Sequence, residues 1–270
     1  MDEILKKQLE PLLKGTPSPL SDCIRYMVYG EGKRIRMRLL MSSADFFKLS
    51  HTSAQEAAVA LELLHTYTLI HDDLPCMDND DIRRGKPSAH RAFNEATALL
   101  AGDALQSMAY ELWSKNHAHC IVQFAYLLGP SGLIGGQAME ESLRNSKNQN
   151  IERLLKVFEM KTANLFIIAA TLPAWTSNAS DQQTHTLHEW AKNLGIAFQV
   201  ADDLEDHFLD KKSDPAHVAY YFKTPTEAAQ QTLQKLNLMD DLLKNQFQGQ
   251  DVSAFLGFSN EIKQKLEETV

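Results

Sequence analysis

LELLHTYTLIHDDLPCMDNDD, residues 61–81, is an apolar run that ends in clustered carboxylates. Within it, Leu61, Leu64 and Thr68 recur at spacings of three and four residues and lead to His71. This spacing indicates an α-helix with one buried face. Burial of the apolar part carries the carboxylates that follow to one end of that helix.

The same spacing of apolar residues continues through most of the chain, and strict alternation over strand lengths is almost absent. Gly and Pro are scarce, at 12 and 9 of 270 residues, which also favours helices. We expect helices over residues 2–13, 18–29, 34–49, 52–73, 94–114, 118–129, 151–171, 184–208, 226–246 and 251–268. Breaks are expected at Gly15–Pro19, Gly30–Gly32, Asp78–Pro87, Gly129–Gly136 and Lys211–Pro215. Without a repeat or a long linker, we expect one all-α domain over residues 1–270.

The composition narrows the class of partner. The formal net charge of −8 disfavours nucleic acid or an anionic membrane as the main partner, but one local basic cluster is enough to bind a small anion. Three cysteines without a CxxC pair argue against a disulfide framework or a structural zinc site. The N-terminus lacks an apolar signal segment, and the apolar stretch 165–175 is shorter than the ~20 residues of a membrane span. We therefore expect a cytoplasmic protein.

A second acidic cluster, DDLED, ends the expected helix 184–208. Its Asp202 and Asp206 are four residues apart, so they lie on one helix face and repel each other. A hard divalent cation such as Mg²⁺ or Ca²⁺ would relieve this repulsion through oxygen ligands. We expect two facing sets of carboxylates at the mouth of one cavity. The alternative is that both acidic runs are simply solvated helix ends.

In the first cluster, Asp72 and Asp78 are six residues apart and would lie on different faces of an ideal helix. Pro75 lies between them and cannot donate a backbone hydrogen bond, so a local bulge is expected. If two residues bulge out, both carboxylates face one way. An EF-hand does not fit, since the central Gly and the terminal Glu are missing.

Basic residues accompany the carboxylates. Arg83 and Arg84 follow the first cluster, GKRIRMR opens a helix near residue 33, and Lys161 lies in an apolar helix. Arg and Lys are the side chains that bind phosphates, and a helix N-terminus adds free N–H groups. Carboxylates, a divalent cation and bases together suggest a polyphosphate ligand. The alternatives are salt bridges from Arg83 and Arg84 to the preceding acids, and a Lys161 that reaches the surface.

These motifs together resemble those of the trans-polyprenyl diphosphate synthases. Residues 65–87 are similar to the family's first aspartate-rich motif, and residues 198–206 are similar to the second. Residues 32–36, 101–105, 135–137 and 161–163 are similar to its remaining blocks, in the same order. The bacterial farnesyl diphosphate synthase subgroup is the nearest, because the first motif has two extra residues that include Pro.

The resemblance implies an isoprenoid-synthase helical bundle around a central active-site cavity, a homodimer, and Mg²⁺-dependent condensation of isopentenyl diphosphate with dimethylallyl or geranyl diphosphate. It implies Mg²⁺ ligands at Asp72, Asp73, Asp78, Asp202, Asp203 and Asp206. It implies Lys161, Thr162, Gln199 and Arg83 as catalytic residues at the allylic substrate, and Lys33, Arg36, His65 and Arg84 as ligands of isopentenyl diphosphate.

Product length is expected to depend on Tyr67, with Thr68 beside it. Tyr67 is five residues before Asp72 and so lies ~7–8 Å deeper along the helix axis. A ring at that depth closes the bottom of a pocket and stops chain growth at a short product, which we expect to be farnesyl diphosphate. The resemblance agrees, since farnesyl-forming members carry an aromatic residue there. The alternative is ordinary core packing of Tyr67.

One departure from the family pattern follows Asp210, where a long loop with Gly-Lys is shortened to KKSDP; Lys212 would replace the missing lysine as a substrate ligand. Other readings remain open. They are a geranylgeranyl or geranyl diphosphate synthase, a terpene cyclase, and a non-catalytic partner subunit of a prenyl synthase. The DDLED motif disfavours the cyclase, whose second metal motif mixes Asn or Asp with Ser or Thr and Glu.

Overall fold

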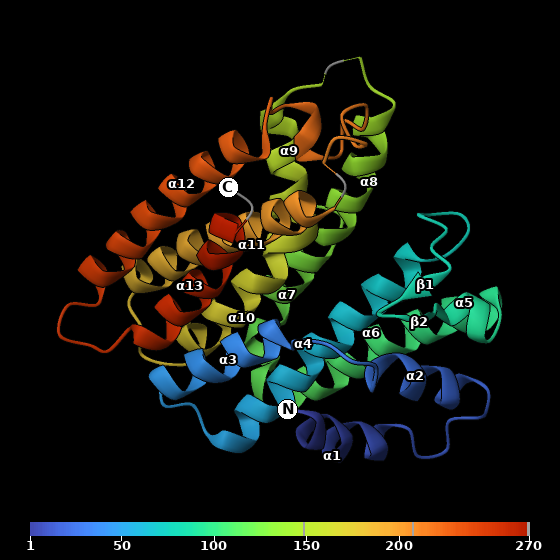
Figure 1. Cartoon of the computed structure of the whole chain (residues 1–270). Helices are drawn as coiled ribbons and strands as arrows, with labels where there is room; N and C mark the ends of the chain where they lie inside the picture. Colours follow the sequence, from blue (N-terminus) through green and yellow to red (C-terminus); the bar gives the residue numbers. More distant parts are fainter. Residues whose placement is uncertain (148, 207, 269–270) are drawn as a thin grey trace. The chain divides into compact units, whose positions relative to one another are not determined.

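The computed structural model describes residues 1–147, 149–206 and 208–268, which form two compact units, Met1–Ile121 and Val122–Val270. Figure 1 shows that the described elements are nearly all helices. The predicted all-α class is therefore confirmed. The single domain over residues 1–270 stays a prediction.

The first unit is built around α4 (His51–Asp72). Its other elements are α1 (Asp2–Leu12), α2 (Leu20–Val28), α3 (Ile35–Phe46), a hairpin of β1 (Ile82–Arg83) and β2 (Lys86–Pro87), α5 (Ala89–Ala92), α6 (Glu95–His117) and η1 (Ala118–Cys120). The N-terminus of α4 is capped by Ser50, whose side chain accepts a hydrogen bond from the Ser53 N–H. α4 packs against α6 and also against α1, α2 and α3. It is buried along most of its length, so it forms the core and presents its acidic end beyond that core.

The second unit is built around α11 (Asp181–Glu205). Its other elements are α7 (Ile121–Leu128), α8 (Leu133–Arg144), α9 (Ile151–Val157), the π-helical segment η2 (Phe158–Ala163), α10 (Asn164–Trp175), η3 (Val218–Tyr220), α12 (Pro225–Gln246) and α13 (Ser253–Glu268). A capping box between Ser180 and Gln183 starts α11. α11 then packs against α10, α12, α13 and η2. The acidic end of α11 is thereby held on a closely packed core, as at α4.

Most expected helices are present within a few residues of their predicted ends. The prediction over 184–208 corresponds to α11, and its residue 207 lies outside the described residues. The break expected across Gly129–Gly136 is wrong in its second half, because α8 starts at Leu133 and includes Gly136. An added Cβ at Gly136 would lie 2.5 Å from the backbone nitrogen of Lys161. This glycine therefore allows α8 to approach η2 closely and does not end a helix.

Within the break expected at Asp78–Pro87, the structure forms the two-residue strands of the β1–β2 hairpin. Antiparallel pairing joins Ile82 to Pro87 and Arg83 to Lys86. Gly85 in the hairpin turn has φ +74°, which favours glycine. The hairpin projects the side chains of Arg83 and Lys86 from a defined backbone in place of a flexible loop.

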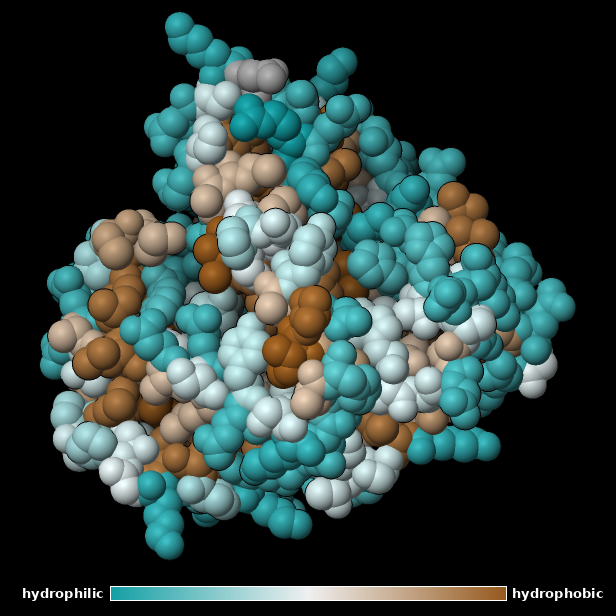
Figure 2. Space-filling view, turned by 180° about the vertical axis from the view of Figure 1, so that it is seen from behind, coloured by the Kyte–Doolittle hydropathy of each residue, from teal (hydrophilic) through white to brown (hydrophobic). Residues whose placement is uncertain are grey.

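Two helical segments, Glu95–Arg144 and Ile151–Trp175, are long and apolar enough to cross a membrane by length and composition alone. In the second, 89% of the apolar window is buried inside the protein, as in the core helix of a folded unit. Figure 2 shows a face with mostly hydrophilic residues and separate groups of hydrophobic ones. Val122 and Leu209 are the most exposed large hydrophobic residues among those described, at 78% and 77%. That no membrane is a partner stays a prediction.

Candidate functional site

The bulge expected between Asp72 and Asp78 is present. The Asp78 N–H donates to the Asp72 carbonyl at 2.9 Å, so a six-residue turn replaces the usual four-residue one. The Asn79 N–H donates to the Leu74 carbonyl at 3.1 Å and closes the same turn from inside. Pro75 lies within the turn, where its missing N–H removes no hydrogen bond. The turn brings the backbones of the two aspartates together at the end of α4.

The second aspartate of this motif, Asp73, has no exposed surface and is bound by Arg83. Arg83 Nε donates to Asp73 Oδ1 at 2.9 Å, and Arg83 Nη2 also bonds to Asp73 Oδ1 and to Asp80 Oδ2, the latter at 3.0 Å. Burial raises the pKa of Asp73, while the hydrogen bonds from Arg83 oppose the rise. The salt bridge to the preceding acids, left open by the sequence, therefore forms for Arg83.

Cationic side chains gather around His65. Arg36 Nη1 lies 3.3 Å from His65 Nε2. Burial first, and then the charges of Arg36, Arg84, Arg34 and Arg83, hold the pKa of His65 well below its usual value. The imidazole is consequently neutral at pH 7, and its Nε2 accepts a hydrogen bond from Arg36.

Arg34, which the sequence did not assign to the site, anchors this group of cations. Its Nη1 donates to Glu62 Oε1 at 2.5 Å, and its Nη2 donates to the carbonyls of Val28 and Gly30 at 2.8 and 2.7 Å. Glu62 is 1% exposed. A buried carboxylate thus balances one charge of the cluster.

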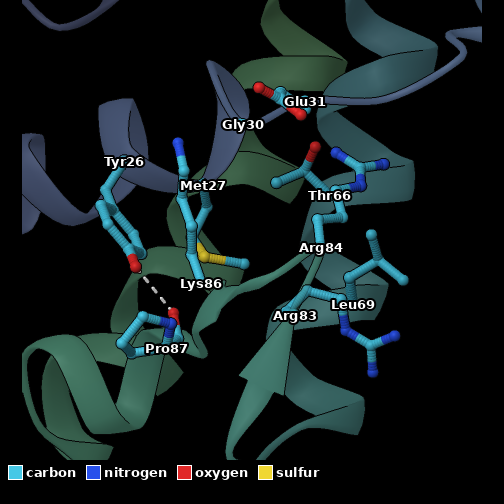
Figure 3. Close-up of a pocket in the computed structure, with 10 residues that line it drawn as sticks. All are labelled: Tyr26, Met27, Gly30, Glu31, Thr66, Leu69, Arg83, Arg84, Lys86 and Pro87. Carbon is cyan, nitrogen blue, oxygen red and sulfur yellow. Dashed lines mark hydrogen bonds between the residues drawn. The ribbon is translucent and has the colours of Figure 1, made fainter.

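Figure 3 shows a pocket of the first unit into which Arg84 extends. Its cavity volume is about 20 Å³, and it is partly open to solvent. It is lined by Tyr26, Met27, Gly30, Glu31, Thr66, Leu69, Arg83, Arg84, Lys86 and Pro87. The Tyr26 hydroxyl donates to the Pro87 carbonyl at 2.8 Å, which ties α2 to the hairpin. The guanidinium groups of Arg83 and Arg84 point in opposite directions from the hairpin.

Arg84 differs from Arg83 in its pairing. Its guanidinium makes no hydrogen bond or ion pair with any residue that the structure describes. Burial, with the nearby charges of Arg34 and Arg83, lowers its pKa. Gly32 lies against it, since an added Cβ there would be 3.0 Å from Arg84 Cζ. A half-buried arginine among other cations is a site for an anion. Lys33 is exposed nearby in sequence, at the start of α3.

The predicted chain-length residues lie one turn and more before Asp72 on α4. Tyr67 is 4% exposed, and its ring packs edge-on against His71 at 5.7 Å between centroids. Burial first, and then Tyr110, raises the pKa of Tyr67. Thr68 is half-buried and its hydroxyl donates to the His65 carbonyl at 2.8 Å. The ring of Tyr67 is therefore fixed in the first unit between His71 and the α6 side, where Tyr110 lies.

In the second unit, Lys161 and Thr162 lie on the π-helical segment η2. Such wide turns inside α-helices are common at functional sites because they re-aim side chains. Lys161 Nζ donates to Glu140 Oε2 of α8 at 2.5 Å. With 22% of its side chain exposed, Lys161 is held by this contact rather than extended to the surface.

A chain of hydrogen bonds runs from Thr162 across α11. The Thr162 hydroxyl donates to Gln199 Oε1 at 2.9 Å, and Gln199 Nε2 donates to Asp203 Oδ1 at 2.9 Å. Asp203 Oδ2 accepts from the Val218 N–H at 3.1 Å. Burial raises the pKa of Asp203 to about 7, against the lowering effect of these two hydrogen bonds. The orientations of Thr162 and Gln199 are thus fixed by a buried carboxylate.

The remaining acids of the second motif reach solvent. Asp202 lies 3.4 Å from Lys265 Nζ, and Asp206 lies 3.6 Å from Lys211 Nζ. Lys212 Nζ donates to the carbonyls of Phe222 and Lys223 at 2.5 and 3.0 Å. Lys212 is thereby committed to backbone carbonyls, and its role as a substrate ligand stays a prediction.

The six predicted metal ligands divide into two kinds. Asp72, Asp78, Asp202 and Asp206 are partly or fully exposed, whereas Asp73 and Asp203 are buried against protein donors. Among the described residues, no three His, Cys, Asp or Glu side chains form a ready metal cluster. Mg²⁺ is commonly held by one or two carboxylates together with substrate phosphates. Within each unit, the two accessible carboxylates fit Mg²⁺ in that manner, and the buried aspartate supports the neighbouring side chains.

Besides Arg34, three contributors were not assigned from the sequence. Lys86 lines the pocket with Arg84, and it belongs to the same RRGK run, which was the available signal. Glu140 holds Lys161 across 21 residues of sequence, and Lys265 reaches Asp202 across 63. Only the packing of α8 and α13 brings these last two into place.

Comparison with known proteins identifies the family. The model of the family described as "Polyprenyl synthetase" matches residues 17–217. A heterodimeric geranylgeranyl pyrophosphate synthase large subunit 2 of Arabidopsis thaliana is 37% identical over 76% of this chain and 57% of its own. The farnesyl diphosphate synthase of Bacillus subtilis is 33% identical over 70% of this chain and 67% of its own. The chain thus spans a little under three fifths of the plant relative's length.

A solved structure agrees in fold. The geranyltransferase of Legionella pneumophila matches 99% of this chain and 95% of its own, with a TM-score of 0.81 and 29% identity. The matched residues 17–217 include both aspartate-rich motifs, the cations around His65 and the Thr162–Gln199 pair. On these grounds the chain belongs to the polyprenyl synthetase family, the trans-polyprenyl diphosphate synthases that its motifs resemble.

Proposed function

We propose that this protein is a prenyltransferase of isoprenoid biosynthesis, which condenses isopentenyl diphosphate with dimethylallyl and then geranyl diphosphate to give farnesyl diphosphate and inorganic diphosphate. The observation that carries the proposal is Arg84, a half-buried guanidinium without a protein partner among the described residues, in a pocket that Arg83 and Lys86 also line. Such an arginine suits the fixed oxygens of a diphosphate. In this proposal Arg84 binds isopentenyl diphosphate, together with Lys33, Arg36 and His65.

The allylic diphosphate is assigned to Arg83 and Lys161. Asp73 and Glu140 hold these two cations in place, so little conformational entropy is lost when the substrate binds. Asp72, Asp78, Asp202 and Asp206 are the proposed ligands of Mg²⁺. When bound, Mg²⁺ would offset the negative charge that develops on the leaving diphosphate.

The reaction breaks the allylic carbon–oxygen bond, which leaves a diphosphate anion and an allylic cation. Thr162 donates its proton to Gln199, so the lone pairs of its hydroxyl oxygen remain for the cation. A neutral oxygen stabilises positive charge without forming a bond as a thiolate or amine would. The double bond of isopentenyl diphosphate then forms the new carbon–carbon bond, and one proton is lost to the departing diphosphate. The protein need not supply a base.

Farnesyl diphosphate is proposed as the product because Tyr67 is a buried ring five residues before Asp72. A geranylgeranyl product is the second candidate, and the names of the plant relatives favour it. The proposal also includes a homodimer and a cytoplasmic location. The three cysteines, which are all free thiols, support the cytoplasmic location.

The test is product analysis of the pure protein with isopentenyl diphosphate, labelled dimethylallyl diphosphate and Mg²⁺, with a chelator control. A chelator-sensitive fifteen-carbon product would support the whole proposal, and a twenty-carbon product would replace its chain length. Arg84→Ala is expected to raise the KM for isopentenyl diphosphate at least about tenfold, since a charge-assisted contact is lost. The matched control is Arg91→Ala, because Arg91 is exposed and pairs with Asp81.

A further inference from the structure

The C-terminal helix α13 is fixed on the second unit by a buried carboxylate. Asp240 of α12 is 2% exposed and accepts from three side chains. Trp190 Nε1, Ser259 Oγ and Lys263 Nζ donate to it at 2.9, 2.7 and 2.6 Å. Because the donors come from α11 and α13, this contact joins three helices and holds α13 against α11 and α12.

Two residues beyond Lys263, the side chain of Lys265 reaches the acidic end of α11. Its Nζ lies 2.8 Å from Glu205 Oε1 and 3.4 Å from Asp202 Oδ1. It also lies 6.0 Å from the centre of the Phe198 ring. The side chain is 21% exposed, so its stem is packed while its ammonium is at the carboxylates.

We propose that Lys265 is a positioning residue of the second aspartate motif. Its ammonium group neutralises Asp202 and Glu205 in the metal-free protein, and Mg²⁺ would displace it from Asp202. The inference rests on the proposed Mg²⁺-dependent function, in which Asp202 is a metal ligand. It concerns α13, which lies outside residues 17–217, the part that the family model matches.

Lys265 and a metal ion compete for the same carboxylate. Asp202, Glu205 and Asp206 place several negative charges within two helical turns, and their repulsion needs a counter-charge. Lys265 supplies one from the protein itself. A carboxylate oxygen held by an ammonium group is less available to a second cation, since the two cations repel each other. The protein therefore gives up the Lys265–Asp202 contact when it binds the metal, and α13 sets the affinity of the motif.

The test measures Mg²⁺ binding separately from catalysis. The melting temperature of the whole protein is followed as MgCl₂ is titrated at constant ionic strength with inorganic diphosphate present. Lys265→Met keeps the packed stem and removes the charge, so the half-saturating Mg²⁺ concentration is expected to fall about tenfold, the size of two partly exposed ion pairs. Lys265→Arg keeps a cation and is expected to stay within about twofold of the wild type.

Lys263→Met is the matched control on the same helix. It breaks the contact with Asp240, so it is expected to lower the melting temperature without moving the half-saturating concentration. Asp202→Asn removes the carboxylate that the two cations share, so adding Lys265→Met in that background is expected to change the half-saturating concentration by less than about twofold. An unchanged or weaker Mg²⁺ affinity in Lys265→Met overturns the inference, and so does an effect of about tenfold that persists when Lys265→Met is combined with Asp202→Asn.

Failure of the inference is distinct from failure of the function. A wild type that forms a chelator-sensitive prenyl product while Lys265→Met leaves Mg²⁺ binding unchanged refutes only the role of Lys265. A wild type that neither saturates with Mg²⁺ nor forms product refutes both.

Discussion

Arg83 on the β1–β2 hairpin donates its Nε–H at 2.9 Å to Asp73, a carboxylate with no exposed surface at the end of α4. The pair links the first aspartate motif to the basic run that follows it. Because Asp73 is bound from inside, the guanidinium is held in one orientation, and 27% of the Arg83 side chain remains exposed. A salt bridge within the protein and a ligand contact are therefore compatible for the same arginine.

Asp73→Asn is expected to lower the free energy of unfolding by about 1–3 kcal/mol, because Arg83 loses a buried charged acceptor. Urea denaturation measures this. Arg91→Asn, which breaks the exposed pair with Asp81, serves as the comparison and should leave stability nearly unchanged. Equal losses in the two variants would contradict a special role for the buried pair.

Tyr67→Ala is expected to lengthen the product beyond fifteen carbons, because a buried ring is removed five residues below Asp72. Chromatography of the dephosphorylated products measures chain length. Tyr67→Phe retains the ring and should retain the wild-type product. If the alanine variant makes the same product as the wild type, Tyr67 is a core residue and nothing more.

His65→Gln is expected to flatten the acid side of the stability curve. The pKa of His65 is depressed in the folded protein, so below the unfolded-state value of about 6.5 the unfolded chain binds more protons. The stability that His65 contributes is therefore present above about pH 6.5 and is lost as the pH falls towards its depressed folded-state value. Urea denaturation between about pH 7.5 and 5.5 should show a smaller loss in the variant than in the wild type. The exposed His51→Gln variant should lose stability with falling pH as steeply as the wild type. If His65→Gln does the same, His65 does not have a depressed pKa in the folded protein.

Gly195→Ala is expected to weaken both stability and catalysis. An added Cβ would lie 2.5 Å from Ala163 Cα, so α11 must move away from η2, which carries Thr162. Overpacking of this kind costs about 1–3 kcal/mol. Gly257→Ala is the matched control, since nothing lies within 4 Å of that added Cβ on α13, and it should stabilise by about 0.5–1 kcal/mol. Thermal melts and turnover rates together measure the two effects, and a neutral Gly195→Ala would show that the helices can separate without cost.

Local chemistry explains which features the sequence predicts well. The wide turn from Asp72 to Asp78 was predicted from Pro75. Because proline lacks an N–H and cannot continue the helical hydrogen bonds, its effect is confined to adjacent residues. The two helices expected from residues 52 and 184 start at His51 and Asp181, after Ser50 and Ser180, whose side chains accept from backbone N–H groups three residues on. The cluster of cations around His65 was predicted in most of its members, since the family motifs place them.

Packing at long range explains what was missed. Gly136 looks like a helix break in the sequence, and its use for a close approach of α8 to η2 depends on a partner 25 residues away. Whether Arg83 meets a carboxylate or solvent depends on how the hairpin folds back on α4. The contacts of Glu140 and Lys265 depend on helices that no local pattern connects to the motifs.

The backbone bond from Asp78 to Asp72 has a consequence for how the motif tolerates changes of length. The peptide groups at both ends of the turn are already joined, so removal of two residues from its interior, such as Cys76 and Met77, would leave a four-residue helical turn with the same two aspartates at its ends. Motifs with and without the two extra residues would then hold the backbones of their two aspartates at the same distance from the end of α4.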